Sequence, residues 1–124
     1  MPRPRIAMTP AEAAEFLAGK RVAIVGTLDV DGMPDGEPAE LSYAGGVLAF
    51  RIPADGPAHR NLLRDQRVVC TVEEFPSYAE IRGVSVHGRA AVVEVSSGRV
   101  AFRVEEPRVE SFDFRKMRRG KPER

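Results

Sequence analysis

The sequence predicts an all-β protein with short helices, in which about six antiparallel strands close into a small barrel. Two observations support this fold class. Apolar residues alternate with polar ones along several short segments, and turns rich in glycine or proline separate most of these segments at hairpin spacing. A chain of 124 residues is the size of one domain. Closing its sheet into a barrel removes the strand edges that invite aggregation, so a barrel is favoured over an open sheet.

The first predicted element is a helix from about Pro10 to Ala18. Thr9 and Glu12 have the spacing of a capping box with proline at the first helical position, so each side chain can bond an amide that the helix leaves free. Gly19 then supplies the left-handed conformation that commonly ends helices. So short a helix needs a barrel to pack on.

The strands begin at Arg21 and are recognised by side chains that repeat with a period of two. The first strand carries apolar residues on both faces, so we expect both faces to be buried. Gly45-Gly46 and Ser96-Ser97-Gly98 predict tight hairpins, and Gly83 and Gly88 predict a bulge or sharp coiling in the longest strand. The expected strands are at about 21–28, 36–44, 47–52, 67–72, 81–95 and 99–105, with a second helix at about 58–66.

Side-chain patterns also predict which residues are buried and where the domain ends. We expect Leu62 and Leu63 to be the apolar contacts of the second helix, and Val92 to share the buried face of the longest strand. Residues 1–114 are interpreted as the barrel domain with its N-terminal helix. Residues 115–124 are interpreted as a basic, solvated C-terminal tail.

Composition argues against several classes of protein. Hydrophobic residues make up 43% of the chain, but no apolar run approaches the roughly 20 residues that span a bilayer, and no signal peptide is recognisable, so we expect a cytoplasmic protein. Cys70 is the one cysteine, which argues against disulfides and metal clusters and suits a small buried hydrophobe. A net charge of +1, without aromatic residues among the cations, argues against nucleic-acid binding.

After the N-terminal helix, five further segments resemble, in order, the pyridoxamine-phosphate-oxidase-like split barrels, a family of flavin- and deazaflavin-binding proteins. They are VAIVGTLDVDGMP (22–34), LAFRI (48–52), RNLLRDQRV (60–68), IRGVSVHGRA (81–90) and VESFD (109–113). The resemblance implies a homodimer with two cofactor sites between its subunits. Each site would hold FMN or a deazaflavin, with the ring against the barrel wall. The composition also suits a high-GC bacterium, where deazaflavin-using relatives are common.

The resemblance places the phosphate tail of the cofactor near the third strand and the helix after it. A phosphate needs cations and amide donors, and the amino end of a helix itself favours anions. The predicted cofactor-binding residues are Arg51, Ile52, Pro53, His59, Arg60 and Asn61.

Three positions depart from the family pattern. Most members carry a Thr or Ser where Ile52 or Pro53 stands and a Lys about where Ala58 stands, and the oxidase branch uses an arginine at the place of Glu37. Phosphate binding would therefore depend on Arg51 and Arg60.

Two candidate residues keep alternative interpretations. Arg51 lies in an apolar strand and needs a partner, which Glu37 or Glu40 across the hairpin would also supply. His87 shares a face with Ser85 and Arg89, and we favour a hydrogen bond to a neighbour on a dimer surface over a ligand contact.

No residue is recognisable as a catalytic acid or base, which flavin chemistry does not require. The sequence therefore predicts a flavin- or deazaflavin-binding oxidoreductase acting on a small substrate that it does not identify. The alternative is a split-barrel dimer without cofactor, with a structural or ligand-sensing role.

Overall fold

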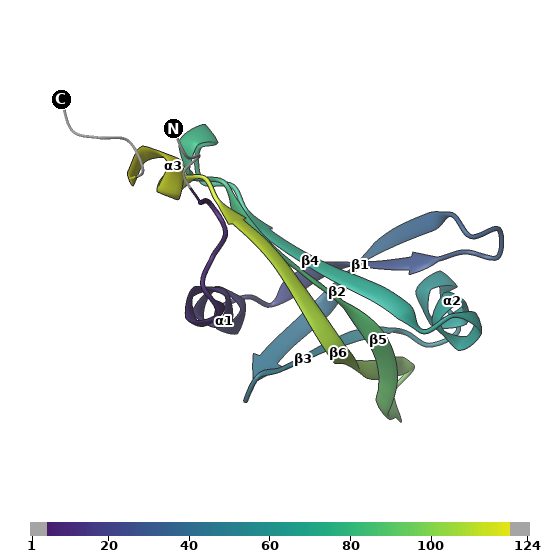
Figure 1. Cartoon of the computed structure of the whole chain (residues 1–124). Helices are drawn as coiled ribbons and strands as arrows, with labels where there is room; N and C mark the ends of the chain where they lie inside the picture. Colours follow the sequence, from purple (N-terminus) through teal and green to yellow (C-terminus); the bar gives the residue numbers. More distant parts are fainter. Residues whose placement is uncertain (1–4, 120–124) are drawn as a thin grey trace.

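The computed structural model describes residues 5–119, and within them six antiparallel strands form a closed barrel (Figure 1). The strands are β1 (Val22–Leu28), β2 (Pro34–Ala44), β3 (Val47–Pro53), β4 (Arg67–Glu74), β5 (Arg82–Ser96) and β6 (Arg99–Asp113). The helices are α1 (Pro10–Ala18), α2 (Pro57–Arg64) and α3 (Arg115–Arg119), with a short 3-10 turn at Tyr78–Glu80. Neighbouring strands follow the order β1-β2-β3-β6-β5-β4, and β1 closes the barrel by pairing with β4. The predicted fold class is confirmed.

The barrel interior is filled by one face of each strand. Phe50 of β3 and Phe102 of β6 stack at its centre, with ring centroids 5.4 Å apart. Cys70 of β4 is completely buried, and this burial raises the pKa of its thiol to about 12. The thiol therefore stays protonated at neutral pH and packs as a small apolar group, as expected from the sequence. No helix within residues 5–119 is long and apolar enough to cross a membrane.

A bulge bends the long ribbon of β5 and β6, as the glycine at position 88 predicts. His87 lies opposite Arg108 and Arg89 lies opposite Glu105, so Gly88 alone faces two residues of β6. A Cβ atom on Gly88 would lie 2.5 Å from the carbonyl oxygen of Glu105, so only glycine fits there. Beyond the bulge β6 continues to Asp113, well past the end expected near Glu105, because pairing with β5 resumes at Arg108.

Within a single chain, β1 is buried on one face only, and not on both as the sequence had led us to expect. Ala23 and Val25 point into the core, whereas Val22 and Ile24 on the outer face are 61% and 49% exposed. The outer face of β1 thus carries apolar side chains that the rest of residues 5–119 leaves largely uncovered.

Two other burial predictions are also wrong. Leu63 is 70% exposed, because α2 turns Ala58 and Leu62, four residues apart, toward the barrel. Val92 is 55% exposed, because the register of β5 and β6 shifts a second time after Val92, where the buried pattern of β5 ends.

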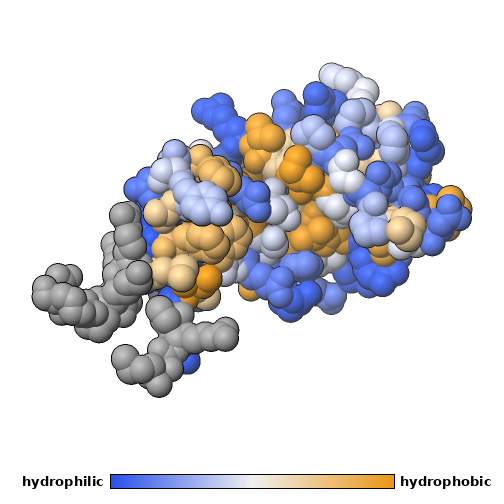
Figure 2. All heavy atoms as spheres, turned by 90° about the horizontal axis from the view of Figure 1, so that it is seen from above, coloured by the Kyte–Doolittle hydropathy of each residue, from blue (hydrophilic) through white to orange (hydrophobic). Residues whose placement is uncertain are grey.

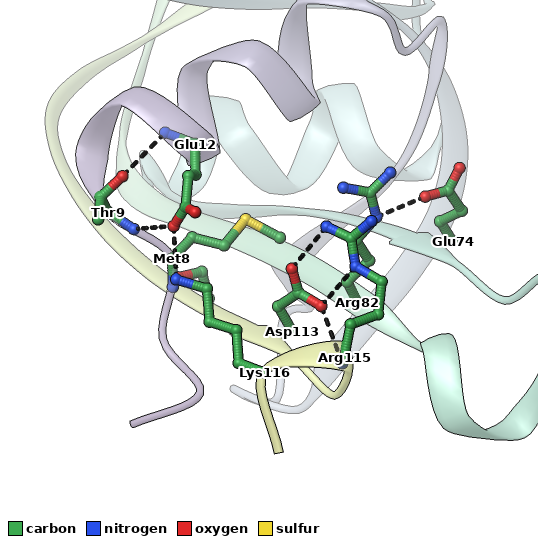
Figure 3. Close-up of polar contacts among 9 residues, drawn as sticks. Met8, Thr9, Glu12, Glu74, Arg82, Asp113, Arg115 and Lys116 are labelled. Carbon is green, nitrogen blue, oxygen red and sulfur yellow. Dashed lines mark hydrogen bonds and ion pairs between the residues drawn. The ribbon is translucent and has the colours of Figure 1, made fainter. Parts of the chain in front are cut away.

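Polar contacts join α1 to the end of β6 and to α3 (Figure 3). The Lys116 Nζ atom lies 2.6 Å from Glu12 Oε1, and the Met8 amide donates to Ser111 Oγ at 2.8 Å. Asp113 is buried, and the side chain of Arg115 donates to both of its carboxylate oxygens. The expectation of a wholly solvated basic tail is therefore wrong for residues 115 and 116, which belong to α3, while residues 120–124 lie outside the described part of the chain.

Candidate functional site

Arg51 lies on the outer wall of the barrel, opposite Glu40 of β2 and Ala101 of β6. It lines a cavity of about 450 Å³ together with Arg21 and Ser42. Neither Arg21 nor Arg51 makes a side-chain hydrogen bond or ion pair with another residue of 5–119. Alternation along β2 and β3 explains the arrangement, since Leu41, Phe50 and Ile52 fill the core and the residues between them face outward. This outer-wall cavity therefore holds two guanidinium groups and the carboxylate of Glu40, which forms no ion pair with either of them.

The acidic residues near this cavity have another partner. Glu40 lies opposite Arg51 in register, but its Oε1 atom lies 3.6 Å from Arg99 Nη1. No ion pair joins Arg51 to Glu37 or Glu40 among the described residues, so the purely structural interpretation of Arg51 is not supported. Pro53 lies with Glu37, Glu40 and Arg99 around an adjoining hollow of about 350 Å³.

Two predicted site residues have buried side chains. Ile52 is fully buried in the barrel core, and Asn61 is 5% exposed on the face of α2 that packs on the barrel. The Asn61 amide donates to Thr27 Oγ1 at 3.0 Å and to Asp35 Oδ2 at 3.3 Å, and its oxygen accepts from Arg64 at 2.6 Å. These bonds engage both the donor and the acceptor of Asn61 and join α2 to β1 and β2.

His59 and Arg60 lie in the first turn of α2 and both contact the loop that precedes it. His59 Nδ1 accepts a hydrogen bond from the Asp55 amide at 2.9 Å, and its ring meets Phe102 edge-on with 6.1 Å between centroids. Arg60 is exposed and donates to the carbonyl oxygen of Asp55. Asp55 itself has a positive φ of 62°, which these two contacts hold in place.

The predicted residues thus divide into two groups. Arg51 and Pro53 line the outer-wall hollows, whereas His59, Arg60 and Asn61 shape the loop and the helix beside them without lining the cavity at Arg51. Sequence reasoning missed Arg21 and Ser42. The signal for Ser42 was the alternation of β2, which places it on the same outer face as Glu40. Arg21 is found only once the pairing of the first two strands is known, because its carbonyl oxygen accepts from the Leu41 amide.

His87 is joined to a neighbouring strand. Its Nε2 atom lies 3.0 Å from Glu110 Oε1 across the ladder of β5 and β6. Ser85 is within hydrogen-bond distance of Thr71, and Arg89 donates to Gln66, so all three polar side chains of this face have partners in the structure. The hydrogen bond expected for His87 is confirmed.

The side chains around Arg51 suit a phosphate group. Two guanidinium groups supply positive charge and several N–H donors, and Ser42 supplies a hydroxyl. Gly56 precedes α2 without a capping side chain, and this helix end favours an anion. Ala58, where the resemblance implies a lysine, is 3% exposed and packs on the core, so it supplies no cation. The donor set therefore fits a phosphate-bearing cofactor through Arg21 and Arg51.

Comparisons with known proteins agree with this architecture. The family model described as pyridoxamine 5'-phosphate oxidase matches residues 9–119. A comparison with curated proteins finds no match. The conserved hypothetical protein Rv2991 from Mycobacterium tuberculosis has a similar structure, with a TM-score of 0.82, 26% identity, and coverage of 100% of this chain and 95% of that one.

Two further structures share the fold at lower identity. A FAD-binding protein from Mycobacterium smegmatis has a TM-score of 0.74 at 15% identity, covering 88% of this chain and 99% of that one. An F420 reductase has a TM-score of 0.61 at 18% identity, covering 73% of this chain and 89% of that one. Since the family model spans almost all of the described residues, the chain belongs to the pyridoxamine 5'-phosphate oxidase family.

Proposed function

We propose that the protein is an oxidoreductase that binds a flavin or deazaflavin on the outer wall of β2, β3 and β6. The observation that carries this proposal is the pair Arg21 and Arg51, two guanidinium groups that form no ion pair within residues 5–119, in one cavity of a chain from this family. The carboxylate of Glu40, which also lines this cavity, lies next to Arg99 instead. The bound cofactor would supply hydride transfer, while the protein supplies binding, orientation and electrostatics.

Each predicted residue has a part in this proposal. Arg51 and Arg21 bind the phosphate of the cofactor, with Ser42 as a further hydrogen-bond partner. Pro53 forms part of the adjoining wall. His59 and Arg60 fix the loop around Asp55, so that the start of α2 keeps its orientation beside the site. Ile52 and Asn61 do not contact the cofactor with their side chains. Ile52 packs in the core and so holds β3, and Asn61 anchors α2 to β1.

We further propose that the protein is a homodimer whose interface includes the outer face of β1. Figure 2 shows apolar residues gathered between hydrophilic margins on the face seen from above in Figure 1. Val22 and Ile24 are exposed on β1, and the neighbouring Pro38 of β2 is exposed opposite Ile24. Exposed apolar patches rimmed by polar residues commonly mark protein interfaces. A second copy of the chain would cover the apolar patch on the outer face of β1.

The dimer proposal is tested by sedimentation of the Ile24→Lys variant. A lysine at the centre of an apolar interface should convert the wild-type dimer to a monomer, whereas Val95→Lys, at an exposed valine of β5, should leave it a dimer. A monomeric wild-type protein, or an Ile24→Lys variant that dimerises as tightly as the wild type, would contradict this interface.

The cofactor proposal is tested by titrating the purified protein with FMN, FAD and F420 and following their fluorescence. We expect at least one to bind with low-micromolar affinity or better. Arg51→Ala and Arg21→Ala should each weaken that binding by roughly tenfold or more, the effect of losing a charged hydrogen bond. Arg108→Ala, which removes an exposed arginine of β6 outside the cavity, should leave it unchanged. The bound cofactor, once reduced, should be reoxidised by a small oxidised substrate in an absorbance assay.

A second candidate function rests on a different observation. Asn61 is engaged by three neighbours and Ala58 is buried, so two positions of the predicted phosphate site have no group free for a ligand. This favours a split-barrel dimer that has lost its cofactor and has a structural or ligand-sensing role. A wild-type protein that binds none of the three cofactors would support this second function and overturn the first.

A further inference from the structure

A second cavity, of about 620 Å³, lies between α1, the hairpin of β2 and β3, and the ribbon of β5 and β6. It shares no lining residue with the cavity at Arg51. Its floor reaches the barrel core, because Leu17, Leu48, Val86 and Val104 line it and each is at most 6% exposed. We call this space the α1 cavity. Its size falls within the roughly 300–1,000 Å³ of small-molecule sites, and its depth suits a small molecule rather than a protein surface.

One wall of the α1 cavity is formed by β6 at the bulge of the β5 and β6 ribbon. Pro107 lines the cavity and follows Glu106, a non-glycine residue with a positive φ of 53°. A backbone conformation of this kind costs on the order of 1 kcal/mol or more and persists only where the surrounding structure enforces it. Opposite it, Gly88 leaves no room for a side chain. The chain thus adopts a strained conformation at the place where a regular ladder would have continued.

The N-terminal segment forms a further wall. Ala7 and Met8 line the cavity, and they are held by the Met8 amide, which donates to Ser111 Oγ at 2.8 Å. The Asp113 amide donates to the carbonyl oxygen of Ile6 at 2.7 Å, which holds the same segment at the residue before Ala7. The wall is therefore bonded to β6 on both sides of Ala7.

The three hydroxyls that line the α1 cavity differ in their hydrogen bonds, and only that of Tyr43 has none within the described part of the chain. Thr9 Oγ1 and Ser111 Oγ accept hydrogen bonds from backbone amides, and the carboxylate of Glu110 contacts His87 and Arg108. Tyr43 lines the cavity and is half-buried, and its hydroxyl has no hydrogen-bond partner within residues 5–119. No lysine or arginine is among the lining residues.

We propose that the α1 cavity binds an uncharged, mainly apolar small molecule with one hydrogen-bonding group, which bonds the Tyr43 hydroxyl. The apolar walls provide the affinity through burial of the ligand. An anionic ligand would meet no cation and would lie near Glu110, while a cationic ligand would meet a carboxylate already shared between two partners. This ligand site is separate from the proposed cofactor site.

The proposal is tested with N-phenyl-1-naphthylamine, an uncharged aromatic amine with one N–H donor that fluoresces strongly in apolar surroundings. The protein should give a saturable, blue-shifted increase in fluorescence that decanol, an uncharged chain with one hydroxyl, reverses by competition. Val109→Trp places a large side chain at the rim of the α1 cavity and should weaken probe binding at least tenfold. Val93→Trp is the matched control, because Val109 and Val93 are 49% and 53% exposed on paired strands and Val93 lies outside the cavity lining.

Three further measurements test the proposal if Val109→Trp does not fold. Ala7→Trp fills the cavity from the N-terminal segment and should have the same effect. In wild-type protein with labelled methionine methyl groups, the probe should shift the Met8 signal and leave that of Met33, which does not line the cavity, unchanged. Tyr43→Phe should weaken binding by about threefold to tenfold, the effect of one lost hydrogen bond.

Probe binding should persist in Arg51→Ala and in the presence of saturating FMN, which separates this site from the proposed cofactor site. A probe that does not bind, that leaves the Met8 methyl signal in place, or that Val93→Trp weakens as much as Val109→Trp would overturn the proposal.

Discussion

The side-chain amide of Asn61 donates to the hydroxyl of Thr27 at 3.0 Å, inside a cluster that joins α2 to the first strand of the barrel. Asp35 accepts from the same amide, and Arg64 donates to its oxygen. Both Asn61 and Thr27 are buried, so these groups have no water to replace a lost partner.

We therefore expect Asn61→Ala to destabilise the protein by about 1–3 kcal/mol, because it leaves the buried Thr27 hydroxyl without its donor. Urea unfolding followed by circular dichroism measures the change. Leu63→Ala, at an exposed position of the same helix, should stay within about 0.5 kcal/mol of the wild type. Unchanged stability together with lost flavin binding would instead identify Asn61 as a direct ligand.

Ala58→Lys should weaken the fold rather than restore a phosphate site. Ala58 is 3% exposed and packs on the core, so a lysine there must bury its charge or push α2 away from the barrel. We expect a loss of about 1–3 kcal/mol in the free energy of unfolding and no gain in FMN affinity. Leu63→Lys introduces the same side chain at an exposed position and serves as the control. Tighter FMN binding by a stable Ala58→Lys protein would contradict this view of α2.

Gly88→Ala should destabilise the protein by about 2 kcal/mol or more, because the added methyl group collides with the carbonyl oxygen of Glu105 and with Val104. Gly19→Ala is a matched control, since a Cβ atom at Gly19 meets nothing within 4 Å. The φ of Gly19 is −92°, so the left-handed conformation expected there is wrong and alanine is not strained. Thermal unfolding compares the two variants. Equal stability of the two would show that the bulge relaxes without cost.

Asp113 should make stability depend on pH in the acid range. The hydrogen bonds from the Arg115 side chain lower the pKa of the Asp113 carboxyl below its ordinary value of 3.8. A carboxyl whose folded pKa is depressed adds stability above its unfolded pKa, and this contribution is lost as the pH falls through the folded value. Asp113→Asn should therefore cost about 1–3 kcal/mol at neutral pH.

The difference between wild type and Asp113→Asn should shrink progressively below about pH 4, as measured by thermal unfolding across that range. Asp31→Asn, in the exposed turn after β1, is the control and should show no such trend. A difference that stays constant down to pH 2 would rule out this origin of the acid sensitivity.

The fold was predictable because alternation and hairpin glycines act locally. Gly45 and Gly46 both have positive φ, and the buried faces of β2, β3 and β4 follow the period of two that the sequence displays. The length of β6 was not predictable in this way. Glu106 and Pro107 interrupt the alternation, and only pairing with β5 shows that the strand resumes after them.

The candidate site was predictable in part for the same reason. Arg51 stands out as a charge within an apolar strand, and its outward position follows from alternation alone. The roles of Asn61 and Arg21 depend on which elements meet in space. Asn61 is occupied because α2 packs beside β1, and Arg21 reaches the cavity because β1 starts next to Leu41. The alternation of side chains along one segment does not show which other segment packs beside it, so neither role was predictable.

The contacts that hold α1 join residues more than a hundred positions apart, with separations of 103 for Met8 and Ser111 and 104 for Glu12 and Lys116. During synthesis, Met8 and α1 therefore gain these anchors only after about a hundred further residues have been made. Because long-range contacts form slowly, this end of the barrel is expected to be completed late in folding, after the local hairpins have formed.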